Sequence, residues 1–320
     1  MAEVFSALDL EDNGARVAVK VFTRGRIQDE ILGVAYDREL RALQGLRHPA
    51  IVELKNYGTD SVNGNQFLVL EWMDSDLSTV FKTRRYEGWD SFYEEVGRLI
   101  LDALRFAHER HIAHRDVKPN NILINAAGAP KLADFGLSKI KTWLLPELTL
   151  NEFVSRPFSP PEYDDGAYTF SRDVFALCAL ALQCLSPFPF ADYKDLKQSL
   201  DSVDLPPAVY DAFVNALSFE PKVRAPNASV LLARLENIQA ERSSQWIKKT
   251  LLHLEVTEST LSSPIARLPG QEQRGDRCDL GERLECRLRL RDLHRTSTNR
   301  NSSTFAVWGQ SFPSRCPSPR

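Results

Sequence analysis

The sequence predicts an α+β protein with two lobes, a small antiparallel sheet that carries one helix and a larger, mainly helical lobe. Two observations lead to this expectation. Up to residue 70, short alternating and β-branched stretches are interrupted by a single helical stripe. Beyond residue 70 the apolar period is helical, apart from two short strand-like stretches at 121–125 and 130–135. Strands and helices segregated along a chain in this way are typical of the α+β class.

The first lobe is predicted from its alternation and turns. Residues 16–22 alternate and are β-branched, as in a half-buried strand. Leucines at 40, 43 and 46 form a helical stripe that stops before Pro49. Residues 51–58 and 65–72 are again strand-like, and Asn63-Gly64 supplies the turn between them.

The second lobe is predicted from longer helical stripes. Residues 91–110 place one apolar face over about five turns, formed by Phe92, Val96, Leu99, Ala103, Leu104 and Ala107. Helices resume at Ser171 and continue to about Gln239. Beyond that point arginine is frequent, and Ser, Pro and Thr scatter without a period. We therefore expect a linker over 241–259 and a disordered tail over 260–320.

Composition bounds the function. The 320 residues are 43% hydrophobic and 26% charged, and the net charge of −3 argues against a protein that coats nucleic acid or an anionic membrane. The longest apolar run, 174–185, is too short to span a bilayer. The five cysteines have no metal-ligand spacing, and the first residues do not resemble a signal peptide. We expect a cytoplasmic protein that binds neither nucleic acid nor membrane; its oligomeric state is not predicted.

The stretch "HRDVKPNN" at 114–121 has the residue types that phosphoryl transfer requires. Asp116 is placed to accept the proton of an attacking hydroxyl. Lys118 is placed to reach a γ-phosphate, and Asn121 to hold a metal ion. "ADFG" follows, and Asp134 offers a second metal ligand at the end of a strand.

Two further charges fit the same chemistry. Lys20 on an early strand can hold the α- and β-phosphates, and Glu39 on the helix can hold that lysine in place. Taken alone, such a pair is more often a solvated surface contact, which contributes only about 0–1 kcal/mol. The presence of Asp116 and Asp134 favours the functional interpretation.

These segments together resemble the protein kinase family, because "VAVK", "HRDVKPNN", "DFG" and "PPE" occur in the family's order and at similar intervals. The resemblance covers residues 4 to about 240 and implies the bilobal kinase fold, with an N-lobe over 1–70, a hinge over 71–76 and a C-lobe over 77–240. It implies an ATP- and Mg²⁺-dependent kinase of protein substrates, and the lysine at 118 resembles serine/threonine kinases.

The resemblance also implies roles for single residues. Asp116, Lys118 and Asn121 are catalytic positions, and Asn121 and Asp134 are the Mg²⁺ ligands. The nucleotide-binding positions are Val4, Ala18, Lys20, Glu39, Leu70 as gatekeeper, Glu71, Met73, Asp76, Leu123 and Asp134.

Other positions are implied to support the site. His114 packs beneath Phe135 rather than acting as an acid or base. Glu162 pairs with Arg224, and Asp173 anchors the backbone of the catalytic stretch. Ser155 supports that stretch, while Thr149, or else Thr142, is the expected activating phosphosite, whose charge would pair with Arg115.

The glycine-rich flap of the family reads G-x-G-x-x-G-x-V. If Val4 is its final valine, Ala2 stands at the third glycine, and both leading glycines precede the sequence. "MAEVF" also looks like the second half of a bacterial-type flap. We therefore expect a sheet without its first strand, an exposed edge at residues 4–8 and weakened nucleotide binding. The alternatives are a pseudokinase or scaffold and, less favoured, a small-molecule phosphotransferase.

Overall fold

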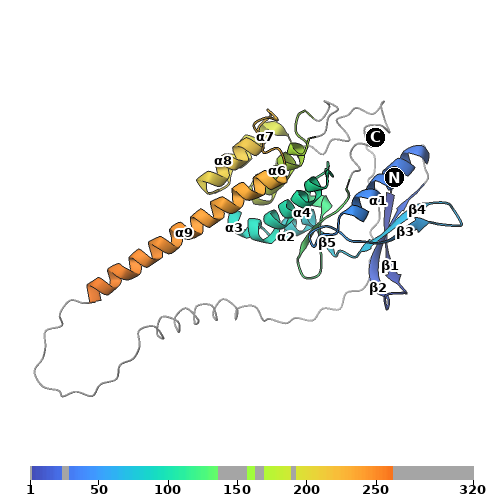
Figure 1. Ribbon diagram of the computed structural model, residues 1–320, viewed down its shortest axis with the longest axis horizontal. Coiled ribbons are helices and arrows are strands. Elements are labelled where there is room, and N and C mark those ends of the chain that lie inside the picture. Colours follow the sequence, from blue (N-terminus) through green and yellow to red (C-terminus); the bar gives the residue numbers. More distant parts are fainter. Residues whose placement is uncertain (1, 24–28, 136–156, 163–168, 189–191, 262–320) are drawn as a thin grey trace, which may run out of the picture. The chain divides into compact units, whose positions relative to one another are not determined.

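The computed structural model describes residues 2–23, 29–135, 157–162, 169–188 and 192–261 (Figure 1). The chain divides into two compact units, Met1–Thr257 and Glu258–Arg320. The architecture below is that of the first unit, which contains both predicted lobes.

The N-lobe is a four-stranded antiparallel sheet in the order β1-β2-β4-β3, with one helix (Figure 1). Its elements are β1 (Ala2–Asp9), β2 (Ala15–Phe22), α1 (Asp29–Gly45), β3 (Leu54–Thr59) and β4 (Gln66–Glu71). The alternating stretch "ARVAVKVF" forms β2, which lies between β1 and β4 and buries Val17 and Phe22. The register places Val4 opposite Lys20, and Ala18 opposite Leu70.

Strand β1 lies at one edge of this sheet. Val4, Phe5 and Leu8 are 63%, 49% and 64% exposed, although all three are large apolar residues. The predicted exposed edge at residues 4–8 is therefore confirmed for the described part of the chain. Such an edge leaves one row of backbone groups without strand partners.

The C-lobe is mainly helical, with a small three-stranded sheet in the order β5-β6-β7. Its elements are β5 (Ser75–Asp76), α2 (Leu77–Thr83), α3 (Trp89–Phe92), η1 (Tyr93–Gly97), α4 (Arg98–Glu109), η2 (Pro119–Asn121), β6 (Ile122–Ile124), β7 (Pro130–Leu132), α6 (Ser171–Leu185), α7 (Tyr193–Ser202), α8 (Pro207–Ala216) and α9 (Ala228–Leu261). Helix α6 is apolar on nearly all sides and buries both Cys178 and Cys184, as expected for a core helix. The α+β, two-lobed fold is confirmed.

Two predicted elements differ in the structure. The helix expected over 91–110 is not regular, because η1 is a turn of π-helix between α3 and α4. The linker expected over 241–259 lies instead within α9, which continues to Leu261. This extension escaped prediction because Trp246 and Ile247 are exposed, so no buried apolar stripe marks it.

The two lobes are joined at a second place besides the hinge. Ile51 forms a parallel bridge with Leu132 of β7. The Val52 N–H donates to the Leu132 carbonyl at 3.0 Å, and the Leu132 N–H donates to the Ala50 carbonyl at 2.9 Å. The segment between α1 and β3 is thereby fixed to the strand that precedes Asp134.

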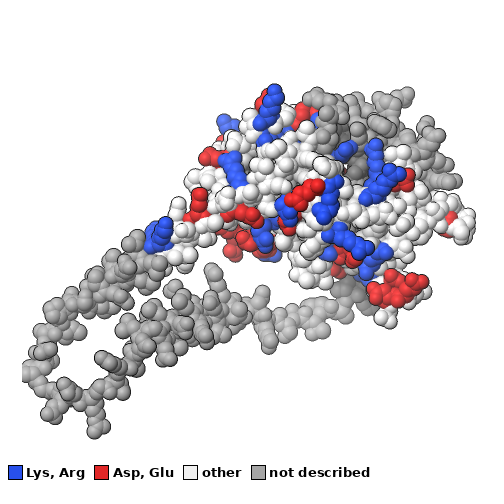
Figure 2. Space-filling model, viewed as in Figure 1, with Lys and Arg blue, Asp and Glu red and all other residues white. Residues whose placement is uncertain are grey.

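The surface carries charges of both signs. On the face shown in Figure 2, Lys and Arg side chains are interspersed with Asp and Glu side chains. None of the helices in the described ranges combines the length and the apolar character that a membrane span requires.

Candidate active site

The three predicted catalytic side chains meet between α4 and β6. The Lys118 ammonium donates to Asp116 Oδ2 at 2.8 Å. Asn121, at the end of the η2 turn, donates from Nδ2 to the Asp116 carbonyl at 2.7 Å and to Asp116 Oδ2 at 3.1 Å. The Asp116 carboxylate is therefore held in place by two side chains from its own stretch.

Asp173, at the start of α6, supports this stretch from below. It is fully buried, and its Oδ2 accepts from the His114 backbone N–H at 2.8 Å and lies 2.9 Å from His108 Nε2. Its Oδ1 accepts from the Arg115 backbone N–H at 2.9 Å. One carboxylate thus takes two successive backbone donors, which fixes the path of the chain into Asp116, as the sequence predicts.

His114 connects the stretch to the end of β7. Its Nε2 lies 2.7 Å from the Ala133 carbonyl, and its ring packs edge-on against Phe135 at 4.7 Å between centroids. Complete burial lowers the pKa of His114, since the charged imidazolium is disfavoured away from water. The predicted packing role is confirmed, and a neutral ring suits it.

Lys20, Glu39 and Asp134 form a charged cluster between the lobes. The Lys20 ammonium lies 2.7 Å from Glu39 Oε1 and 2.6 Å from Asp134 Oδ1, and Lys20 and Glu39 are buried. The predicted Lys20–Glu39 ion pair is therefore present.

The protonation of this cluster is shifted by burial and by its charges. Burial raises the pKa of Glu39 to about 7, an effect that Lys20 only partly offsets. Burial also tends to raise the pKa of Asp134, but the neighbouring Lys20 ammonium outweighs burial there, and the pKa of Asp134 is lowered. Burial by itself would lower the pKa of Lys20, yet the two carboxylates raise it, so the ammonium stays charged.

Two residues of the site have a backbone conformation that is uncommon without glycine. Arg115 has φ 72° and Asp134 has φ 63°. Such conformations cost roughly 1–3 kcal/mol and persist only where surrounding contacts impose them. Here the backbone of Arg115 is held by Asp173, and the side chain of Asp134 by Lys20.

The predicted adenine positions come together beside the hinge. Met73 packs with Val52 and Ala133 in a small buried cluster, and Leu70 and Leu123 pack against it. Sequence reasoning missed Val52 and Ala133. Ala133 could have been found from its place immediately before Asp134, whereas Val52 carries no signal beyond its apolar strand.

The remaining nucleotide-binding predictions are placed by their elements. Ala18 faces Leu70 across β2 and β4, and Val4 lies on the exposed strand opposite Lys20. Asp76 caps α2, because its carboxylate accepts from the Thr79 backbone N–H at 3.0 Å. Hydroxyl and backbone donors of α2 outweigh burial there and lower the pKa of Asp76.

The side chain of Glu71 is bound to the C-lobe. Its two oxygens lie 2.6 and 2.8 Å from the Lys131 ammonium on β7. The Glu53 backbone N–H also donates to Glu71 Oε1 at 2.8 Å, and the Glu71 N–H donates back to the Glu53 carbonyl at 3.0 Å. The hinge is thus tied both to Glu53, the residue before β3, and to the C-lobe by contacts that the sequence did not reveal.

The predicted Glu162–Arg224 ion pair is present. Arg224 Nη2 donates to Glu162 Oε2 at 2.9 Å, and the guanidinium holds the pKa of that carboxylate low against the opposing effect of burial. Ser155, Thr142 and Thr149 lie outside the described residues.

The expected Mg²⁺ ligands suit that ion by their chemistry. Asn121 donates to Asp116 through Nδ2 and not through its amide oxygen, which is the atom that could bind a cation, and the Asp134 side chain is 40% exposed. Mg²⁺ prefers oxygen ligands, and it is usually held by one or two protein groups together with water and substrate phosphates. The described residues contain no cluster of three or more His, Cys, Asp or Glu side chains that could hold a metal without such help.

A two-lobed fold that brings a lysine–glutamate pair, a strand-end aspartate and an aspartate–lysine–asparagine group together defines a phosphotransferase-type site. The protein kinase domain family matches residues 1–251. The chain belongs to this family.

Curated relatives agree with this assignment. The chain is 34% identical to "Serine/threonine-protein kinase crk1" of Schizosaccharomyces pombe over 54% of this chain and 50% of the relative. It is 34% identical to "Cyclin-dependent kinase D-1" of Arabidopsis thaliana over 58% and 46%, respectively. It is 30% identical to "Aurora kinase B" of Danio rerio over 67% and 69%. The chain thus spans half or less of the length of the first two relatives.

Proposed function

We propose that this chain is a serine/threonine protein kinase that transfers the γ-phosphoryl group of ATP to hydroxyls of protein substrates. The observation that carries the proposal is the convergence of Lys118 and Asn121 on the Asp116 carboxylate. A carboxylate held in this way can accept the proton of an acceptor hydroxyl while a cation stands beside it. The printed names of the relatives support the substrate class.

Each side chain has one task in this proposal. Asp116 orients the acceptor hydroxyl and takes its proton, and Lys118 supplies positive charge beside the transferring group. Lys20 holds the α- and β-phosphates and is itself oriented by Glu39. Bound Mg²⁺ would be held by Asn121 and Asp134 and would neutralise charge on the phosphates.

The adenine ring is proposed to lie among Ala18, Leu70, Met73 and Leu123, beneath Val4. These side chains share one small region of the fold, since Leu70 is opposite Ala18 in the sheet and packs with Leu123 on the Met73 cluster. The backbone of the hinge, from Glu71 to Met73, would meet the base, and Asp76 would lie at its far end.

Several finer statements belong to this proposal. The kinase domain is taken to span residues 1–240, and the protein to be cytoplasmic, with protein substrates as partners. The bacterial-type assignment rests on the resemblance of residues 1–5 to half of a glycine-rich flap. Calorimetric titration with Mg·ATP tests the flap, because equal affinity for this chain and for one carrying a complete G-x-G-x-x-G segment would contradict weakened binding.

The chemistry is tested with two substitutions. Asp116→Asn is expected to lower phosphate transfer from radiolabelled ATP to a generic substrate protein by about 10²–10⁴-fold, the range of a lost general base. Mg·ATP binding should stay close to wild type, because this residue contacts the acceptor. Asp134→Asn is expected to lose both transfer and binding.

Asp204→Asn is the matched control, since Asp204 is exposed and lies far along the chain from the site. Phosphoamino-acid analysis of the product should give phosphoserine or phosphothreonine. Retention of near-wild-type turnover by Asp116→Asn would overturn the assignment of the base. Tight Mg·ATP binding without transfer in the wild-type chain would support a scaffold instead.

A further inference from the structure

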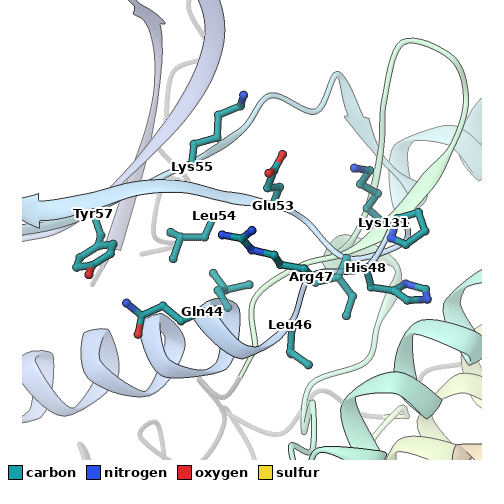
Figure 3. Close-up of a pocket in the computed structure, with 12 residues that line it drawn as sticks. Gln44, Leu46, Arg47, His48, Glu53, Leu54, Lys55, Tyr57 and Lys131 are labelled. Atoms are coloured by element: carbon teal, nitrogen blue, oxygen red, sulfur yellow. The ribbon is translucent and has the colours of Figure 1, made fainter. Parts of the chain in front are cut away.

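A cavity lies between the end of α1, the start of β3 and Lys131 of β7 (Figure 3). Its volume is about 430 Å³, which lies within the range of ordinary ligand sites. Lys20, Asp116 and Asp134 do not line it, so it is separate from the proposed phosphotransfer centre. None of the roles proposed above uses this cavity.

The cavity has an apolar floor. Leu43 and Leu46, on the last turns of α1 and just beyond, are 3% and 2% exposed, and Leu54 of β3 is half-buried beside them. Tyr57 stands at one side with 47% of its surface exposed. Figure 3 shows Leu54 and Tyr57 directed toward the α1 side of the strand. An apolar side chain of moderate size could pack on this floor.

The rim carries three cations, Arg47, Lys55 and Lys131, and one exposed carboxylate, Glu53 (Figure 3). Arg47 is exposed, and within the described part of the chain its guanidinium makes no ion pair with a carboxylate. Lys55 is also at the rim, and its ion pair with Asp12 is long, at 3.8 Å. Lys131, by contrast, is occupied by Glu71. Arg47 is therefore the group at this rim best placed to bind an added anion.

The walls are held in place before any ligand arrives. His48 Nε2 lies 3.1 Å from Asp102 Oδ2, and its Nδ1 accepts from the Ala50 backbone N–H at 3.1 Å. The start of β3 is fixed by the reciprocal bonds between Glu53 and Glu71. A pre-organised site loses less entropy when a ligand binds.

We propose that this cavity is a docking site for an acidic peptide segment of a partner protein, in which an apolar side chain packs on Leu43, Leu46 and Leu54 and a neighbouring carboxylate pairs with Arg47. A guanidinium binds a carboxylate through two parallel hydrogen bonds. The excess of positive charge at the rim selects the acidic partner, and the exposed apolar surface of Leu54 and Tyr57 selects a peptide over a small inorganic anion, which would leave that surface in contact with water.

The test uses a short fluorescein-labelled peptide with a central leucine–phenylalanine pair flanked by glutamates, titrated by fluorescence anisotropy with the full chain. Arg47→Glu is expected to weaken binding about tenfold or more, because a charge-assisted pair is replaced by repulsion. Tyr57→Ala should weaken it by a smaller factor. Lys197→Glu reverses an exposed charge on α7 and should leave binding unchanged.

Two matched peptides and one ion decide between the occupants. A peptide with glutamines for glutamates and one with serines for the apolar pair should both bind at least tenfold more weakly. Inorganic phosphate should compete only at far higher concentration. Absence of saturable binding, equal binding by Arg47→Glu, or competition by phosphate alone at similar concentration would each overturn the proposal.

Discussion

Substitution of Asp173 by asparagine should loosen the catalytic stretch while leaving the fold intact. The carboxylate takes the backbone N–H groups of His114 and Arg115 on different oxygens, and His108 lies against one of them. Asparagine has one oxygen, so it can satisfy the His114 side or the Arg115 side but not both. The amide N–H₂ group of the asparagine then faces the other backbone N–H, which is left without an acceptor.

The magnitude follows from these contacts. A buried donor without a partner costs about 1–3 kcal/mol, and the loss of a charge-assisted bond adds a comparable amount, so we expect a loss of about 2–5 kcal/mol. Domains are typically stable by about 5–15 kcal/mol, so the variant should still fold. Phosphate transfer should fall further than the unfolded fraction explains, because Asp116 directly follows Arg115.

The assay is urea unfolding followed by the fluorescence of the five tryptophans, together with transfer measured at a temperature where the variant is folded. Asp211→Asn on α8 is the control, because Asp211 is exposed and such changes usually stay within about 0.5 kcal/mol. A stability loss below about 1 kcal/mol for Asp173→Asn, or full activity, would show that this carboxylate does not hold the stretch in place.

Two further predictions concern the hinge and the charged cluster. Lys131→Met should lower the free energy of unfolding by about 1–3 kcal/mol, because the Glu71 carboxylate loses its cation. The double variant with Glu71→Leu should recover much of that loss. If the two substitutions instead had additive effects in this double-mutant cycle, the contact would be contradicted. The pKa of Glu39 is raised to about 7 from the ordinary 4.5, so this group favours the folded state below pH 4.5 and loses that contribution as the pH rises through 7. Protonation also removes the charge that orients Lys20, so kcat/KM should fall as the pH drops through about 7, and an acid limb found only near pH 5 would refute the assignment.

The sequence could predict the elements that a short residue pattern indicates and the site residues that lie in motifs of the kinase family. The alternation of β2 and the stripe of α1 set the N-lobe elements, and the spacing of "HRDVKPNN" and "DFG" located the charged groups. The pairing of Glu162 with Arg224 was predicted across 62 positions because both lie in recognisable segments.

The features that sequence could not predict depend on packing between distant segments. Lys131 and Glu71 are 60 positions apart, and neither lies in a motif that indicates a contact. The π-helical turn at Tyr93–Gly97 has a similar cause. A Cβ on Gly97 would lie 3.1 Å from the Phe92 ring, so the glycine allows a close approach that no periodicity encodes. The length of α9 was missed because its exposed residues carry no stripe.

The second junction between the lobes has a consequence for motion. The chain passes from lobe to lobe at the hinge, and independently the backbone at Ile51 and Val52 is bonded to Leu132 of β7. A body attached to another at two separated points keeps one easy rotation, about the line through both points. Opening of the N-lobe should therefore be a swing about this axis, with twisting or sliding resisted by the Leu132 bonds. Residues 50–52 would move least, while β1, farthest along the sheet from β3, would travel most.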